Sequence, residues 1–291
     1  MIAEIEKLIV RHSGKPHALH RVMFAARDTP TEPSAVMNEQ ASFAFVASGQ
    51  KHVVLGDRTF TYGRGQYLVI SAELPLVSNI TRASKKQPFV GVGLKLDASA
   101  IASLLLEGTR DDGITQGIAV HQAGADLIDA LARLLRLLDH PRDLPVLAPM
   151  AEREILWRLL TGEQGAMIRQ IGLADSRLSQ IARAIRAIRS RYAEPLRIDE
   201  LVHIAGMSPS SFHRHFRAVT AMTPIQYQKQ IRLQEARARL LGAGVGDVAA
   251  VGRIVGYDSA SQFSREYRRL YGVAPMMHLS GISRSRREHH G

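Results

Sequence analysis

Two short stretches in the C-terminal half of the chain carry side chains that can hydrogen-bond to nucleic acid. Each stretch repeats its polar residues at helical spacing, which places them along one face of a helix. Arginine, glutamine, histidine and serine offer donors and acceptors suited to base edges and phosphate oxygens. In chain order, these residues are Ser210, His213, Arg214 and Arg217, and then Ser261, Gln262, Arg265 and Arg268. The pattern predicts two helices that can bind a polyanion.

Each of these stretches has aromatic residues four apart on the face opposite the polar one. Phe212 and Phe216 recur as Phe263 and Tyr267, displaced by 51 residues, and Gly206 recurs as Gly256, displaced by 50. A glycine permits the positive-φ turn that swings one helix across another. The repeat therefore predicts two helix-turn-helix units, at about 198–218 and 247–271, joined by a long helix over about 224–241.

The excess positive charge lies in the same half of the chain. Residues 1–165 hold 18 Lys and Arg against 18 Asp and Glu, whereas residues 166–291 hold 20 against 9, which accounts for the whole net charge of +11. Such asymmetry favours a nucleic-acid partner for the C-terminal half. By charge alone, that partner could be DNA, RNA or an acidic membrane.

Composition excludes several other classes. The chain has no cysteine, so disulfides, thiolate zinc sites and thiol sensors are ruled out. The first residues do not read as a signal peptide, and no run of eighteen apolar residues occurs. We therefore expect a cytoplasmic protein without a membrane partner.

The N-terminal half reads as a different kind of structure. Residues 42–97 contain short β-branched and aromatic runs separated by glycine-containing turns, which predicts antiparallel hairpins closing into a small barrel or sandwich. Leucine-rich helices are expected over about 126–139 and 147–160, one of them packing under the barrel and the other available to a second copy. Three glycines between Thr161 and Gly172 indicate a linker.

The stretch from Ile198 to Leu279 resembles the DNA-binding domain of the AraC/XylS family of transcriptional regulators. The segment VGRIVGYDSASQFSREYRRLYGVAP carries most of the resemblance. It implies base contacts from Ser264 as well as from Ser210, His213, Arg214, Ser261, Gln262 and Arg265. It implies phosphate contacts from Arg217, Lys229, Arg232, Arg268 and Arg269. Ala221 departs from the family pattern, which usually has glycine there, so the turn at this point is expected to be tighter or shifted.

The N-terminal half resembles the effector domain of an AraC-like subgroup, through GQYLVISAELP followed by AS and Pro88. This resemblance implies a cupin-like barrel. The predicted fold is α+β: a cupin-like effector-binding and dimerisation domain over 1–162 with flanking helices, a linker over 163–175, and an all-α DNA-binding domain of seven helices over 176–291.

Candidates for a ligand pocket in the barrel are aromatic strand residues and one nearby cation. They are Phe43, Phe45, Tyr62, Tyr67 and Arg82. Aromatic residues in strands more often form the core, so that alternative stays open for each of them. Only His52 lies in the strand region, which gives little support to a metal, and we expect neither a metal nor another cofactor.

The favoured function is a sequence-specific, dimeric transcription regulator that binds double-stranded DNA and responds to a small-molecule effector. RNA polymerase is a possible further partner. One alternative is a non-specific architectural DNA-binding protein. An enzyme on the barrel is a second alternative, against which the missing nucleophile and metal motifs argue.

Overall fold

The structure is a computed structural model, and it describes residues 1–105, 117–173, 176–242 and 247–277. The chain divides into two compact units. One comprises Met1–Ala182 with Ser210–Ala221, and the other comprises Arg183–Pro209 with Met222–Gly291. Each unit is described by itself.

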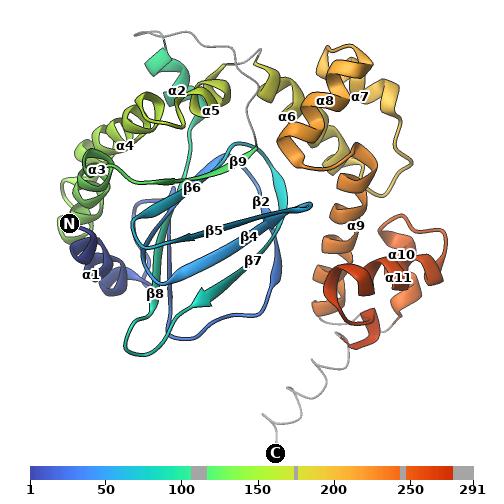
Figure 1. Cartoon of the computed structure of the whole chain (residues 1–291), viewed down its shortest axis with the longest axis horizontal. Helices are drawn as coiled ribbons and strands as arrows, with labels where there is room; N and C mark the ends of the chain where they lie inside the picture. The colour runs from blue at the N-terminus through green and yellow to red at the C-terminus, as the bar shows by residue number, and fades with distance from the viewer. Residues whose placement is uncertain (106–116, 174–175, 243–246, 278–291) are drawn as a thin grey trace, which may run out of the picture. The chain divides into compact units, whose positions relative to one another are not determined.

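The first unit contains two antiparallel sheets (Figure 1). The five-stranded sheet has the order β1-β8-β3-β6-β9, with bounds Val22–Arg27, Phe89–Lys95, Ser42–Ser48, Gln66–Ile70 and Ile118–Gln122. The four-stranded sheet has the order β2-β7-β4-β5, with bounds Ser34–Asn38, Leu74–Arg82, Gln50–Leu55 and Arg58–Gly63.

The predicted hairpins form where the glycines stand. Gly49, Gly56 and Gly65 all have positive φ, and they join β3 to β4, β4 to β5, and β5 to β6. The strands lie in two separate sheets and do not close into a barrel, the first of the two arrangements that the hairpin pattern predicts. Three strands also lie outside the predicted strand region, namely β1, β2 and β9. In β1 and β2, apolar and polar residues alternate less clearly along the sequence, because their side chains are largely exposed or half-buried.

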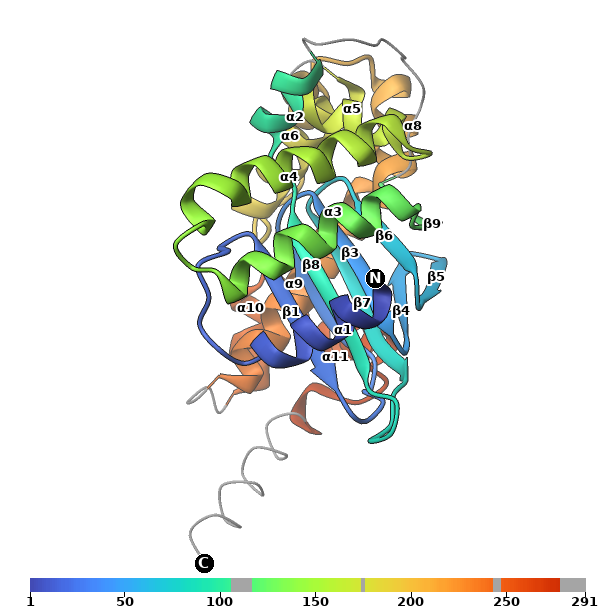
Figure 2. The same cartoon turned by 90° about the vertical axis from the view of Figure 1, so that its left-hand side faces the viewer.

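Helices cover the five-stranded sheet on its outer side (Figure 2). They are α1 (Ile2–His12), α3 (Ala125–Arg136) and α4 (Leu144–Thr161), and their leucines and isoleucines share one core with Phe43, Tyr67 and Val92 of the sheet. The two predicted leucine-rich helices correspond to α3 and α4. The short helices α2 (Ala98–Leu105) and α5 (Gly165–Gly172) extend this layer.

The helix α5 falls within residues 163–175, for which the sequence predicts a linker. Met167 and Ile168 are buried in the helical core, which explains why glycine at 162 and 165 does not leave this stretch without structure. The domain boundaries inferred from the sequence stay a prediction.

Six further helices follow within the described part of the chain, as the periodicity predicts. They are α6 (Arg177–Ser190), α7 (Ile198–Ala205), α8 (Pro209–Thr220), α9 (Pro224–Leu241), α10 (Val248–Ile254) and α11 (Ala260–Tyr271). The seventh predicted helix, after Pro275, falls largely outside the described residues. Among the described helices, none is long and apolar enough to cross a membrane.

The turns of both helix-turn-helix units have the predicted backbone conformation. Gly206 and Gly256 have φ of 65° and 92°, and α9 begins with a capping box between Thr223 and Gln226. Ala221 has φ of 56°, so an alanine takes the conformation for which the family usually has glycine. The turn therefore keeps this left-handed backbone conformation, which costs an alanine roughly 1–2 kcal/mol.

Candidate nucleic-acid interface and ligand cavity

Helix α11 presents one polar face and one buried face. Phe263 and Tyr267 are completely buried, and they pack with Leu233 and Leu240 of α9 and with Val251 of α10. The side chains predicted to contact DNA lie on the other side. Ser261, Arg265, Arg268 and Arg269 are exposed, whereas Gln262 and Ser264 are half-buried.

The N-terminus of α11 is closed by a side-chain cap. Ser259 Oγ accepts a hydrogen bond from the backbone amide of Gln262 and lies 2.9 Å from Ser261 Oγ. This cap fixes the first turn of the helix, and with it the positions of Ser261 and Gln262 at the end of α11 that enters a groove first in helix-turn-helix proteins.

Glu266 connects three residues beneath the polar face. Its carboxylate accepts hydrogen bonds from Lys229 Nζ at 2.7 Å, Tyr257 Oη at 2.8 Å and Gln262 Nε2 at 3.2 Å. Burial raises the pKa of Glu266, but the hydrogen bonds from Lys229, Tyr257 and Gln262 outweigh burial, and the pKa lies below its ordinary value. Glu266 is not among the site residues predicted from the sequence, although its i, i+4 spacing from Gln262 is a usable signal.

Arg232 of α9 is engaged with the protein backbone. Its guanidinium donates to the carbonyl oxygens of Tyr192, Ala193, Glu194 and Gly256, at 2.6–3.2 Å, and lies over the ring of Tyr257. Lys229 is held by Glu266. These two predicted phosphate ligands therefore have protein partners, whereas Arg265, Arg268 and Arg269 form no ion pair with any residue that the structure describes.

Helix α8 has the same division into faces. Phe212 and Phe216 are completely buried, and Ser210, His213, Arg214 and Arg217 are exposed. His215 is buried on the aromatic side, so its ring faces away from that of His213. Burial lowers the pKa of His215, with Arg214 and Arg177 adding to the effect. The four predicted contact residues of α8 thus lie on one exposed face.

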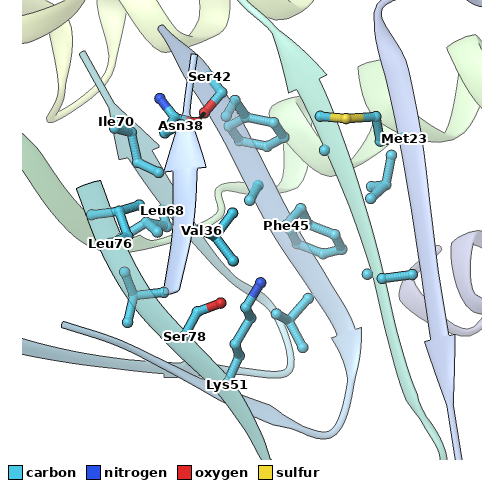
Figure 3. A pocket seen from close by; sticks show the side chains of 18 of the residues that line it. Met23, Val36, Asn38, Ser42, Phe45, Lys51, Leu68, Ile70, Leu76 and Ser78 are labelled. Carbon is cyan, nitrogen blue, oxygen red and sulfur yellow. Dashed lines mark hydrogen bonds between the residues drawn. The ribbon is translucent and has the colours of Figure 1, made fainter. Parts of the chain in front are cut away.

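A cavity of about 360 Å³ lies among the strands of the first unit (Figure 3). Its walls are mostly apolar and include Val36, Val46, Leu68, Ile70 and Leu76. Asn38 and Ser42 lie at one end of the view, and Lys51 and Ser78 at the other. A volume of this size is at the lower end of the roughly 300–1,000 Å³ that small-ligand sites occupy.

The five predicted pocket residues are divided by the structure. Phe43, Phe45 and Tyr62 line the cavity, and Phe43 and Phe45 also belong to the core under the helices. Tyr67 belongs to the core under the helices, and Arg82 is an exposed residue at the end of β7; neither lines the cavity. Lys51 was missed, although the alternation of Lys51, Val53 and Leu55 in β4 places a lysine on the apolar face of the strand.

No group of three or more histidine or acidic side chains suited to a metal ion occurs in the described ranges. The cavity and the two polar helix faces are therefore the candidate sites that the described residues offer.

The chain matches two families. Residues 18–167 match the AraC-type transcriptional regulator N-terminus, and residues 201–279 match a helix-turn-helix domain. The HTH-type transcriptional regulator ArgR of Pseudomonas aeruginosa is 25% identical over 142 residues, which are 49% of this chain and 43% of that protein. ExsA of the same organism is 23% identical over 84% of this chain and 88% of its own length. The chain spans less than half the length of the first curated relatives it matches.

Solved structures show a similar fold. ToxT from Vibrio cholerae strain SCE256, with an unsaturated fatty acid bound, has a TM-score of 0.54 at 10% identity, over 91% of this chain and 96% of that one. An apo ToxT variant has the same TM-score at 11% identity, over 91% and 98%.

Proposed function

We propose, from the premise that this chain belongs to the family of AraC-type transcriptional regulators, that it binds double-stranded DNA sequence-specifically through α8 and α11. The observation that carries the proposal is the two-faced construction of both helices. In each, two fully buried aromatic side chains anchor the helix, while serine and arginine side chains on the opposite face are exposed. Exposed arginine is the side chain that most often reads guanine in the major groove.

The two helices present different residues. Arg265 and Gln262 of α11 are the principal base readers on one side, and Arg214 and His213 of α8 on the other. Because the sets differ, one protomer should recognise an asymmetric site whose two halves lie about one helical turn, roughly 34 Å, apart. Ser210, Ser261 and Ser264 would add weaker base contacts, and Arg217, Arg268 and Arg269 would contact phosphates.

The same proposal includes control by a small molecule bound in the cavity of the first unit. ToxT, which has a similar fold, was solved with an unsaturated fatty acid, and the cavity here has the size of a small-ligand site. A ligand controls DNA binding only if it binds two states of the protein with different affinity. We also propose that RNA polymerase is a further partner and that the protein is located in the cytoplasm.

The dimer partner is proposed to be a second copy docked on α4. Val146, Leu147 and Met150 of this helix are exposed by 66%, 42% and 64%, and Trp157 by 37%. Val146, Met150 and Trp157 lie close to one stripe of the helix. Clustered exposed apolar side chains of this kind mark association surfaces, and the opposite side of α4 is already buried in the core through Ile155 and Leu159.

The experiment that tests DNA reading is selection of bound sequences from a pool of random duplexes by the full chain. A specific reader enriches one asymmetric site, bound at least a thousandfold more tightly than random DNA at the same salt concentration. Equal affinity for all sequences would contradict the proposal and favour the architectural alternative.

A further inference from the structure

The cavity exists because the inward face of the five-stranded sheet carries small side chains. In the register of the sheet, Ala25 is opposite Gly91 and Ala44 is opposite Gly93, and all four residues line the cavity. Facing sheets normally fill the space between them with interdigitating large side chains. Four adjacent positions without such side chains leave room for a guest molecule.

Lys51 enters this space from β4. Figure 3 shows its side chain rising into the cavity, with the hydroxyl of Ser78 turned towards it. In the strand register, Lys51 is opposite Tyr62 on β5 and diagonal to Ser78 on β7. None of these three side chains has a hydrogen-bond or ion-pair partner among the residues that the structure describes. One end of the cavity therefore offers an ammonium and two hydroxyls without an acceptor.

Asn38 and Ser42, at the other end of the cavity, are already hydrogen-bonded within the protein. Asn38 donates to the carbonyl oxygen of Ala72 at 3.0 Å and accepts from Ser42 Oγ at 2.8 Å. Lys95 also lines the cavity and is opposite Ser42 in the register, and the exposed Glu39 follows Asn38 in the chain; neither forms an ion pair with a described residue. Lys51 is the charged side chain at the opposite end of the cavity, next to Ser78.

We propose that the cavity binds a small carboxylic acid with an apolar body, its carboxylate paired with Lys51 Nζ and its body lying against Val36, Leu68 and Ile70. This assignment rests on the proposed function of the first unit as the effector-binding unit. A single ammonium matches one negative charge, whereas phosphate sites bring together several cations or a row of backbone amides. Burial also lowers the pKa of Lys51, and a bound carboxylate reverses that penalty by pairing with the ammonium.

Calorimetric titration of the full chain with octanoate, 1-octanol and octylamine tests the assignment. These probes share an apolar body and differ in the head group. We expect octanoate to bind at least tenfold more tightly than 1-octanol, and octylamine to bind most weakly. If 1-octanol or octylamine bound as tightly as octanoate, or if none of the three bound, the assignment would be overturned.

Three variants locate the effect. Lys51→Met keeps most of the length of the side chain without its charge, and it should remove the preference for octanoate over 1-octanol while binding of 1-octanol persists. Lys51→Arg should restore the preference. Gly93→Val should block both probes, because a Cβ at Gly93 meets Met23 Cε at 3.4 Å and further atoms would occupy the cavity. An unchanged preference in Lys51→Met would contradict the role of Lys51.

Binding of each variant to the selected DNA site, measured in parallel, separates this inference from the proposed function. If the wild-type chain reads DNA selectively but shows no preference for octanoate, only the ligand class is wrong. If it prefers octanoate through Lys51 but reads no DNA sequence, the proposed function fails and the ligand class stands.

Discussion

Gln262 Nε2 donates a hydrogen bond of 3.2 Å to Glu266 Oε1, and this contact orients the amide of Gln262 on the exposed side of α11. One of the two amide hydrogens is thereby used inside the protein. The amide oxygen and the second hydrogen are left for a base, which is the pair that matches adenine. A partly buried hydrogen-bond network thus orients Gln262 before DNA binds.

Removal of the Glu266 carboxylate should weaken DNA binding without removing a DNA contact. In Glu266→Gln, Lys229 loses its ion-pair partner and Gln262 loses a charged acceptor, so we expect affinity for the selected site to fall about tenfold, equivalent to ~1.4 kcal/mol. Competition titration with duplexes altered at the base read by Gln262 measures this. Glu235→Gln is a matched control, because Glu235 pairs with Arg239 on α9.

The same carboxylate should make stability depend on acidity. The pKa of Glu266 is lower in the folded chain than its ordinary value, so its contribution to stability is complete above about pH 4.3 and is lost as the pH falls through the lower folded value. Thermal unfolding followed from pH 7 to pH 3 should show a shallower loss of Tm in Glu266→Gln than in the wild type. Parallel curves would contradict this account.

The two turn glycines should respond differently to substitution. Gly206→Ala adds a Cβ that meets nothing within 4 Å, so it should cost only the roughly 1–2 kcal/mol of left-handed backbone strain. Gly256→Ala carries the same strain, and its Cβ also collides with the backbone of Ala193, adding about 1–3 kcal/mol. Chemical denaturation measures both losses. Equal losses would mean that the close approach at Gly256 is absent.

The arginines should separate into those that bind DNA and those that support the fold. Arg268→Ala and Arg269→Ala should each reduce the slope of log affinity against log salt by about 0.9 per lost phosphate contact, with little change in stability. Arg232→Ala instead removes a donor from four carbonyl oxygens. Those of Tyr192 and Glu194 keep a second donor, Gln228 Nε2, whereas those of Ala193 and Gly256 lose the side-chain donor that Arg232 supplies. It should lower the free energy of unfolding by about 2–4 kcal/mol. If only Arg232→Ala changed the slope of log affinity against log salt, Arg232 and not Arg268 or Arg269 would be the phosphate ligand.

Association through α4 should depend on its exposed apolar stripe. Met150→Glu places a charge at a side chain that is 64% exposed, so the fold should persist while the proposed dimer interface is lost. Light scattering at micromolar concentration should find a dimer for the wild type and a monomer for this variant. Arg142→Glu, an exposed change just before α4, is the control and should remain dimeric.

Much of this organisation could be predicted from local sequence. The aromatic pairs and turn glycines of the 50/51-residue repeat lie within single helices and turns, where periodicity is informative. The two-sheet arrangement could not be predicted in the same way, because β1 and β9 pair with strands that are distant in the sequence. The cavity depends on Ala25, Ala44, Gly91 and Gly93 coming together from three strands. The backbone role of Arg232 depends on loops some 24 to 40 residues away.

The central claim is that α8 and α11 each read their own half of one asymmetric site. The most direct test measures base preferences on the selected site by substituting each base pair in turn. It compares the wild type with Arg214→Ala and Arg265→Ala. The account predicts that each variant loses discrimination worth about 1–3 kcal/mol at one position, and that the two positions lie about one helical turn apart. Uniform weakening at all positions in both variants, with no position losing its preference, would contradict it.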